Sequence, residues 1–485
     1  MVADKMLKSF LFLILVFLSY QDKFSFKHHV QAFSSEETLQ EESSEQFELI
    51  HRHASILSTV SKLERMKQLV HGDSVRKEEI SNRIEVVKRR RANEVLIQPR
   101  EMISPMRSAS DVGLGQYFVS FRVGTPPQKA VLIADTGSDL TWLKCNYGKL
   151  FGHLDASEFH TAKTFWADRS PTFRFVPCGS KVCSDDLSNL FSLADCPKDG
   201  APCAYDYRYA DGSFITGHFA FDTVTVSLRN KEPMRVKDIL IGCSNSTQSF
   251  EKADGVMGLG YGKHSFAIRA AEEFGAKFSY CLVDHLSPSN HINYLTFGNT
   301  TRTYLPHMQQ TELIVGHIGT FYAVDVQGIS VDGKMLDIPA EVWDVTSKGG
   351  VIFDTGTTLT ALVKPAYGPL MDALKLKLSK FKKVEIPDLI MEHCFNSTGF
   401  KESDAPKLSI HFKDGAVFVP LVRSYIIELE ADVNCLGFTG IGWPDVSVIG
   451  NILQQNHLWE FDVGKHKLRF GPSHCKVVKT KSFKG

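Results

Sequence analysis

The sequence carries no excess of charge, because its 55 basic residues are balanced by 55 acidic ones. A chain without net charge has no global field to hold nucleic acid or an anionic membrane, so we expect neither as a partner. Hydrophobic residues still make up 43% of the 485 positions. That share excludes a disordered chain and is enough to bury a core in two large lobes or domains.

Long apolar runs are also scarce. The longest, FLFLILVFL at residues 10–18, follows Lys5 and Lys8 and is shorter than the roughly 20 residues of a membrane span. We therefore expect a secretory signal peptide over residues 1–32 rather than a membrane anchor or a buried helix. The polar, basic KVVKTKSFKG at the C-terminus offers neither a second span nor a lipid-anchor signal. We expect a secretory-pathway product, extracellular in the apoplast or vacuolar, with no stable membrane anchor.

Cysteine is missing from the first 144 residues, and all ten cysteines lie at or beyond Cys145. An even number behind a signal peptide predicts five disulfides. Metal binding is the alternative for one group of four, which lacks the C-x-x-C spacing of a zinc site: Cys178, Cys183, Cys196 and Cys203. We expect no metal and no cofactor.

Several catalytic signatures are absent as well. The sequence has no G-x-S-x-G nucleophile elbow and no H-E-x-x-H zinc motif, and GLGYGK at 258–263 satisfies neither a dinucleotide nor a P-loop pattern. These absences leave serine hydrolase, zinc protease and nucleotide-dependent chemistry without support in the sequence.

Residues 33–107 form a distinct, locally basic segment. Between His51 and Arg107 there are 13 lysines and arginines against 7 acidic residues, with a peak at Lys88-Arg89-Arg90-Arg91. Apolar residues recur at helical spacing in SILSTVSKLERMKQLV at 55–70, which predicts an amphipathic helix. We interpret the segment as a cationic propeptide that covers an acidic cleft and inhibits its own chain; a solvated linker and a nucleic-acid patch remain as alternatives.

After Gly115 the pattern changes to the period of a β-strand. Tyr117, Val119, Phe121 and Val123 alternate with other residues, and a Gly-Thr-Pro-Pro turn follows. One helix is predicted, at residues 364–380. The remainder of the chain is expected to be mostly β.

The sequence VLIADTGS at 131–138 has a counterpart in GVIFDTGT at 350–357, and the two aspartates are 219 positions apart (354 − 135). Each half also contains a later apolar-glycine element, GVMGLG at 255–260 and SVIGNI at 447–452. Two copies of one pattern predict two pseudo-twofold related lobes, each with one active carboxylate.

Two carboxylates about 3 Å apart cannot both ionise cheaply, so Asp135 and Asp354 are expected to share a proton. The ionised one would activate a water, while its protonated partner donates to the scissile carbonyl. The residues around each aspartate are expected to orient the carboxylates, allow close approach of the backbone and tie the two loops together: Thr136, Gly137, Ser138, Thr355, Gly356 and Thr357.

A third element is YDYRYADGSFITG at 205–217, where Asp211-Gly212 predicts a β-hairpin. By itself this is an ordinary surface hairpin. Beside a carboxylate pair it is a candidate flap that closes on an extended peptide, with Tyr209 over the cleft.

Together, VLIADTGSDLTW, YADGS, GVIFDTGTTLT and SVIGNI resemble the pepsin family of aspartic proteases over about residues 115–475. The stretches YFVSFRVGTPPQ, VPCGSKVCSDDL and FELIHRH are similar to the plant nepenthesin-like group. The resemblance implies a mainly β, bilobal, monomeric enzyme with lobes at 108–310 and 311–485. It further implies a zymogen, acid-optimal endopeptidase activity on protein or peptide substrates, and inhibition by pepstatin-type compounds.

Carried over by motif, Asp135 and Asp354 are the catalytic pair, Tyr209 is the flap tyrosine, and Trp142 is the tryptophan that hydrogen-bonds it or simply packs in the core. The resemblance also implies disulfides Cys178–Cys203, Cys183–Cys196, Cys281–Cys475 and Cys394–Cys435, which leave Cys145 to pair with Cys243. The sequence after Trp142 lacks cysteines usual in the group, which puts that last bridge in doubt.

Possible N-glycosylation sites occur at Asn245, Asn299 and Asn396. The main rival function is a catalytically silent binding or inhibitor protein on the same fold. A further rival, suggested by the basic leader and tail, is a plastid protease that binds nucleic acid.

Overall fold

The computed structural model describes residues 45–51, 117–151, 164–188, 194–196, 200–208, 214–228, 233–248, 253–284, 293–298, 308–387 and 389–475. All of them belong to one compact unit of the chain. The expected signal peptide and most of the expected propeptide, including its helix at 55–70, lie outside the described residues.

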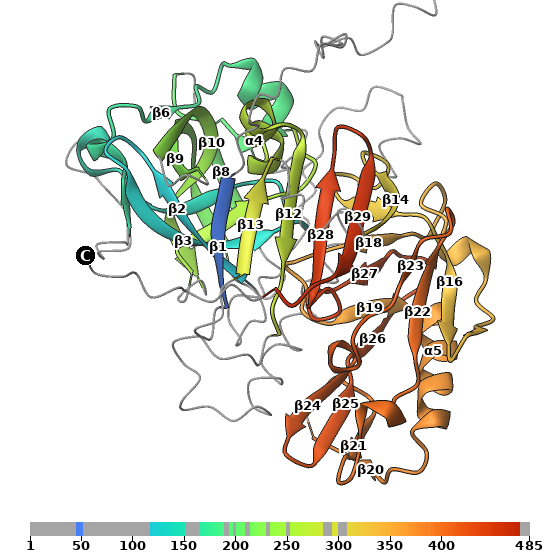
Figure 1. Cartoon of the computed structure of the whole chain (residues 1–485). Helices are drawn as coiled ribbons and strands as arrows, with labels where there is room; N and C mark the ends of the chain where they lie inside the picture. Colours follow the sequence, from blue (N-terminus) through green and yellow to red (C-terminus); the bar gives the residue numbers. More distant parts are fainter. Residues whose placement is uncertain are drawn as a thin grey trace, which may run out of the picture. The chain divides into compact units, whose positions relative to one another are not determined.

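Strands dominate the first half of the described chain (Figure 1). They are β1 (Glu45–His51), β2 (Tyr117–Val123), β3 (Gln128–Asp135), β4 (Trp142–Asn146), β5 (Phe165–Trp166), β6 (Arg174–Phe175), β7 (Ala194–Asp195), β8 (Ala204–Arg208), β9 (Phe214–Ser227), β10 (Pro233–Gln248), β11 (Gly255–Gly258), β12 (Lys277–Cys281) and β13 (Asn293–Phe297). The helix α4 (Phe266–Phe274) follows β11.

The second half repeats this character. Its strands are β14 (Gln309–Ile314), β15 (Tyr322–Val324), β16 (Val326–Val331), β17 (Lys334–Met335), β18 (Val351–Phe353), β19 (Thr360–Val363), β20 (Lys383–Val384), β21 (Cys394–Asn396), β22 (Leu408–Phe412), β23 (Val417–Phe418), β24 (Ile426–Glu430), β25 (Val433–Leu436), β26 (Phe438–Ile441), β27 (Ser447–Ile449), β28 (His457–Asp462) and β29 (Lys467–Pro472). The helix α5 (Lys364–Lys377) begins where predicted and ends three residues earlier. The expected mainly β fold is confirmed.

The strand predicted from alternation is β2. Tyr117, Val119, Phe121 and Val123 are each at most 1% exposed, which is the burial that period-2 spacing requires of a core-facing row. β2 pairs antiparallel with β3, with Val119 opposite Leu132. This hairpin brings β3, and the aspartate at its end, into the core of the first half.

Each Asp-Thr-Gly loop follows a strand that has a parallel neighbour. β11 runs parallel to β3, with Gly258 opposite Asp135, and β27 runs parallel to β18, with Ile449 opposite Phe353. The two apolar-glycine elements of the sequence are therefore the strands that flank the two aspartates.

Strands from both halves meet in one sheet. β12 pairs antiparallel with β28, where Tyr280 lies opposite Trp459, and β28 pairs in turn with β29. In Figure 1 these strands lie between the green strands of the first half and the orange strands of the second. Buried aromatic side chains fill this region, including the stacked rings of Phe278 and Phe461.

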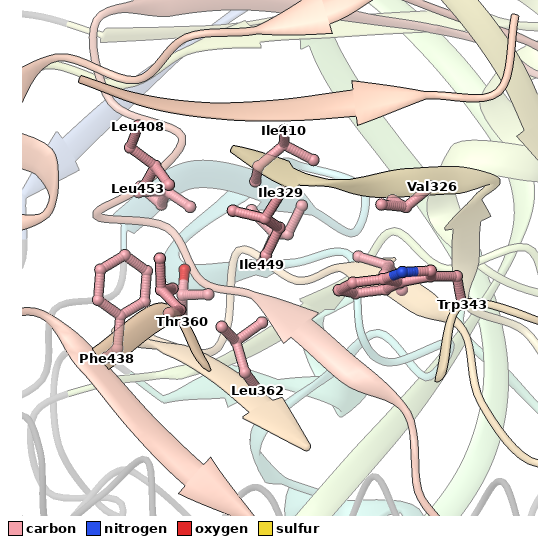
Figure 2. A pocket seen from close by; sticks show the side chains of 12 residues that line it. Val326, Ile329, Trp343, Thr360, Leu362, Leu408, Ile410, Phe438, Ile449 and Leu453 are labelled. Carbon is pink, nitrogen blue, oxygen red and sulfur yellow. The ribbon is translucent and has the colours of Figure 1, made fainter. Parts of the chain in front are cut away.

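The core of the second half contains a pocket lined in part by Thr360 and Leu362 of β19 and Ile449 of β27 (Figure 2). Eleven apolar side chains and Thr360 line it, and none is more than 6% exposed: Val326, Ile329, Trp343, Val351, Thr360, Leu362, Leu370, Leu408, Ile410, Phe438, Ile449 and Leu453. Because its walls are core residues and almost all of them are apolar, the pocket is a packing space inside this half.

Candidate active site

Asp135 is the last residue of β3 and is only 3% exposed. Its Oδ1 accepts a hydrogen bond from the backbone N–H of Gly137 at 2.9 Å, and its Oδ2 accepts one from the Ser138 hydroxyl at 2.6 Å. Both donors come from the next three residues, so the turn itself orients the carboxylate. Hydrogen bonds of this kind favour the ionised form of an acid.

Asp354 follows β18 and is held in the same way. It is fully buried, its Oδ1 accepts from the N–H of Gly356 at 2.8 Å, and its Oδ2 accepts from the Thr357 hydroxyl at 2.5 Å. The two aspartates therefore have equivalent local supports, one backbone donor and one hydroxyl each. This is the pattern expected of two half-sites with the same role.

The two loops are joined by their threonines. The N–H of Thr136 donates to Oγ1 of Thr355 at 3.1 Å, and the N–H of Thr355 donates to Oγ1 of Thr136 at 3.0 Å. The same hydroxyls then donate onward, Thr136 to the Phe353 carbonyl at 3.3 Å and Thr355 to the Ala134 carbonyl at 2.9 Å. This reciprocal set brings the loops that carry Asp135 and Asp354 against each other.

The glycine-containing segments that follow β11 and β27 hold the two Asp-Thr-Gly loops through backbone hydrogen bonds. In the first half, the N–H of Leu259 donates to the Asp135 carbonyl at 2.9 Å. In the second half, the N–H of Asn451 donates to the Thr357 carbonyl at 2.7 Å. A Cβ added to Gly258 or Gly450 would collide with the backbone of the loop in front of it, which explains why glycine stands at both positions.

Three polar residues behind Asp354 were not predicted from the sequence. Gln454 and Asn451 are fully buried and Tyr280 is 2% exposed. The Tyr280 hydroxyl donates to Oε1 of Gln454 at 2.6 Å, and Nε2 of Gln454 donates to the Ile449 carbonyl at 2.7 Å. Asn451 donates through Nδ2 to the Thr355 carbonyl at 3.0 Å. The polar residues of GNILQQN, directly after an apolar strand, could have pointed to Asn451 and Gln454 but not to Tyr280.

The electrostatics of Tyr280 reflect its place near the site. Burial, followed by the negative charge of Asp354, raises the pKa of the Tyr280 phenol well above its usual value of 10.0. Tyr280 therefore stays protonated at any working pH. It acts as a fixed hydrogen-bond donor to Gln454, which in turn donates to the Ile449 carbonyl beside the Asp354 loop.

The structure describes the base of the hairpin that the sequence predicts as a flap. β8 and β9 pair antiparallel from Ala204 opposite His218 to Arg208 opposite Phe214. The tip residues Tyr209, Asp211 and Gly212 lie outside the described residues, so their role stays a prediction. Trp142 begins β4, is 3% exposed and packs in a cluster with Tyr205; a hydrogen bond from its indole to Tyr209 stays a prediction.

The structure joins Cys145 to Cys243, Cys281 to Cys475 and Cys394 to Cys435, as the resemblance implies. It corrects the other two bridges, pairing Cys178 with Cys196 and Cys183 with Cys203. Cys183 and Cys203 are both at most 2% exposed and share an apolar cluster, whereas Cys196 is exposed. The sulfurs of Cys183 and Cys196 lie only 3.5 Å apart without being bonded to each other. Sequence similarity therefore predicted the right four cysteines but paired them wrongly.

The sulfurs of Cys178, Cys183 and Cys196 lie within 4.8 Å of one another. Each is already in a disulfide, and a disulfide sulfur is not the thiolate that binds zinc. Among the candidate glycosylation sites, Asn396 is exposed at the end of β21, Asn245 is partly buried in β10, and Asn299 lies outside the described residues. Within the described ranges, no helix is long and apolar enough to cross a membrane.

Two hydrogen-bonded Asp-Thr-Gly loops, each backed by a parallel glycine strand on a mainly β fold, define the class of pepsin-like aspartic protease folds. Among solved structures, Basic 7S globulin from soybean is similar with a TM-score of 0.60 and 18% identity, covering 77% of this chain and 97% of that chain. That likeness concerns the fold alone.

Sequence comparisons give the family. A model described as Xylanase inhibitor N-terminal matches residues 117–299, and one described as Xylanase inhibitor C-terminal matches residues 321–472. Aspartyl protease family protein 2 of Arabidopsis thaliana is 32% identical over 386 residues, 78% of this chain and 75% of the relative. Aspartic proteinase nepenthesin-2 of Nepenthes gracilis is 28% identical over 371 residues, 75% of this chain and 78% of the relative. The chain belongs to the plant family of pepsin-like aspartic proteases.

Proposed function

We propose that the protein is an aspartic endopeptidase that hydrolyses peptide bonds of protein or peptide substrates at acidic pH. The observation that carries this proposal is the equivalence of the two loops. Asp135 and Asp354 each accept one backbone N–H and one hydroxyl, and Thr136 and Thr355 exchange hydrogen bonds between them. The names of the relatives, which describe aspartic proteases, support the same class of activity.

In the proposed mechanism the two carboxylates share one proton, because two buried like charges at close range cannot both ionise cheaply. The ionised member takes a proton from a water, which attacks the scissile carbonyl carbon. The protonated member donates its proton to the carbonyl oxygen, which yields a tetrahedral intermediate. The supports from Ser138 and Thr357 keep each carboxylate oriented while the proton moves.

The flap is assigned to the hairpin of β8 and β9. Its base is anchored by pairing along both strands and by packing of Tyr205 against Phe219. We place Tyr209, Asp211 and Gly212 at the moving tip, where closing would exclude water and hold an extended substrate. Trp142 supports the base of this hairpin through the cluster that it shares with Tyr205.

Zymogen formation is proposed from the place of β1. This strand lies in the expected propeptide, yet it pairs with β13 on one side and β2 on the other, with Leu49 opposite both Asn293 and Val119. A leader that contributes a strand to the sheet of the enzyme can act as its intramolecular inhibitor. Cleavage near residue 107 would free β1 from its covalent link to the catalytic unit.

The five disulfides support passage through an oxidising secretory compartment, followed by an extracellular or vacuolar location. The protein would reach it without a stable membrane anchor and would act as a monomer. Glycosylation is expected first at Asn396, because this residue is exposed.

A second candidate function is a catalytically silent binding or inhibitor protein, and the descriptions of the two matching family models favour keeping it. One cleavage assay distinguishes the enzyme from the binding protein. Purified protein whose leader has been removed is incubated with a denatured protein at about pH 3.5 to 5, where a shared-proton dyad is active, with and without pepstatin. Cleavage blocked by pepstatin supports the enzyme, and absence of cleavage supports the binding protein.

A further inference from the structure

The loop after β11, residues 259–265, is a junction between several parts of the molecule, and we call it the junction loop. Its backbone holds the first catalytic loop, because the N–H of Leu259 donates to the Asp135 carbonyl at 2.9 Å and that of Gly260 to the Ser138 carbonyl at 2.8 Å. It also contacts the second half, where the N–H of Tyr261 donates to the Thr320 carbonyl at 2.7 Å. A shift of the junction loop would therefore displace the backbone of Asp135.

Asp139 is the side-chain link between the catalytic loop and the junction loop. It is 5% exposed, and its Oδ1 accepts the N–H of Gly262 at 2.9 Å. A Cβ added to Gly260 or Gly262 would come within 2.5 or 2.6 Å of the same carboxylate oxygen. The junction loop thus lies directly against Asp139, with no space for an intervening side chain.

The cysteine-rich segment, residues 178–203, holds the junction loop from its other side. Asp186 lies in the short helical turn η4 (Val182–Leu187). Its Oδ2 accepts hydrogen bonds from Nζ of Lys263 at 2.8 Å and from Nε2 of His264 at 3.0 Å. The His264 side chain is only 11% exposed, against 67% for Lys263, so His264 is the more firmly placed partner.

The same turn also packs on the strand that continues from the catalytic loop. Cys183 and Leu187, on either side of Asp186, are at most 2% exposed and share an apolar cluster with Leu140 and Trp142. The cysteine-rich segment therefore contacts two regions on either side of Asp139. It packs through apolar side chains on residues 140–142, and it forms hydrogen bonds with Lys263 and His264.

We propose that Asp186 is a positioning residue for the catalytic loop. By holding His264 and Lys263 it fixes the junction loop, which in turn fixes Asp139, Ser138 and the backbone of Asp135. This deepens the proposed protease function and rests on it. Asp186 lies outside the described contacts of both catalytic carboxylates, so its effect is transmitted through the junction loop.

The charges around Asp186 suit this role in acid. Partial burial acts to raise the pKa of Asp186, but the hydrogen bonds from Lys263 and His264 outweigh it and lower that pKa below its usual 3.8. Burial lowers the pKa of His264, with Asp186 opposing it and the positive charges of Lys263 and Arg269 adding to it. Asp186 thus keeps its negative charge to lower pH than an ordinary aspartate, which favours its role as an acceptor in acid.

The test compares Asp186→Ala with Asp185→Ala in the full chain after leader removal. Both remove one carboxylate from the same turn, but Asp185 is exposed and accepts a bond from its neighbour Ser184. We expect Asp186→Ala to lower kcat about tenfold through misplacement of the catalytic loop while KM stays within about twofold. Asp185→Ala should keep the wild-type kcat.

Amide hydrogen exchange provides a readout that does not need activity. Asp186→Ala should speed exchange at Leu259, Gly260 and Gly262, and Asp185→Ala should not. If the wild type cleaves nothing, the proposed function fails, but the exchange result still decides whether Asp186 positions the loop. Unchanged exchange at these amides in Asp186→Ala, or a lower melting temperature with unchanged kcat, would overturn the proposal.

Discussion

Thr136 and Thr355 donate their backbone N–H groups to each other's side-chain oxygens, at 3.1 and 3.0 Å, although they are 219 residues apart. Each residue lies between an aspartate and a glycine, so the pair connects the loop of Asp135 to the loop of Asp354. The hydrogen bonds that these two threonines make match one for one on the two sides. The symmetry seen in the sequence as a repeated tripeptide is thus present in the structure as a reciprocal set of hydrogen bonds.

Thr355→Val should damage both activity and stability. It keeps the shape of the side chain but removes a hydroxyl that donates to the Ala134 carbonyl and accepts from Thr136. We expect the free energy of unfolding to fall by about 2 kcal/mol, since two buried partners lose their bonds, and kcat to fall at least about tenfold. Denaturant unfolding and steady-state kinetics measure both. Thr355→Ser, which retains the hydroxyl, should behave nearly as wild type; a fully active Val variant would refute the role of the pair.

Asp135→Asn and Asp354→Asn should each abolish cleavage while the protein stays folded. Asparagine preserves the shape of aspartate. Its Oδ1 can still accept the N–H of Gly137 or Gly356, and its Nδ2 can donate to the hydroxyl of Ser138 or Thr357, which then acts as the acceptor. It cannot share the proton, so the acid and base roles are lost. Circular dichroism should show no change in either variant. Substantial activity in one of them would show that a single carboxylate suffices.

Gln454→Met should destabilise the protein by about 1 to 3 kcal/mol, the range for leaving buried polar partners unsatisfied. The Tyr280 hydroxyl loses its acceptor, and the Ile449 carbonyl loses one donor but keeps the N–H of Asp354 at 3.2 Å. A double-mutant cycle with Tyr280→Phe isolates the first of them. If the effects of the two substitutions on the free energy of unfolding simply add, the bond between Gln454 and Tyr280 contributes nothing.

His218 should make stability depend on pH in a defined window. Burial lowers the pKa of this imidazole from 6.5 to about 4, and its Nδ1 lies 3.0 Å from the Tyr147 hydroxyl. Because the unfolded chain binds the proton more readily, the free energy of unfolding should fall as the pH drops from about 6.5 towards about 4, and this contribution should level off below. The slope is measured by denaturant unfolding at a series of pH values. His218→Gln should flatten it; an unchanged slope would assign it to other groups.

The parts of the site that could be predicted are those with short-range causes. The donors to each aspartate lie two and three residues further along the chain, so a tripeptide and its next residue are enough to suggest them. The period-2 pattern at Tyr117 to Val123 and the helix after Val363 likewise depend on local spacing.

The parts that could not be predicted depend on long-range packing. Gln454 meets Tyr280 across 174 residues and Asp139 meets Gly262 across 123, and no local pattern pairs them. The two corrected disulfides join cysteines whose sulfurs cluster in space, so spacing cannot tell which neighbours bond. The flap tip and most of the leader lie outside the described residues and stay predictions.

In the proposed mechanism Asp135 and Asp354 act as one coupled acid–base pair. The most direct test is the pH profile of kcat/KM for a peptide substrate after leader removal, with pepstatin as a check on the site. We expect a bell-shaped profile with its maximum in acid, between the two apparent pKa values of the pair, and complete loss of pepstatin-sensitive turnover in Asp354→Asn. A profile that rises to neutral pH with a single titration, or turnover that resists pepstatin, would contradict it.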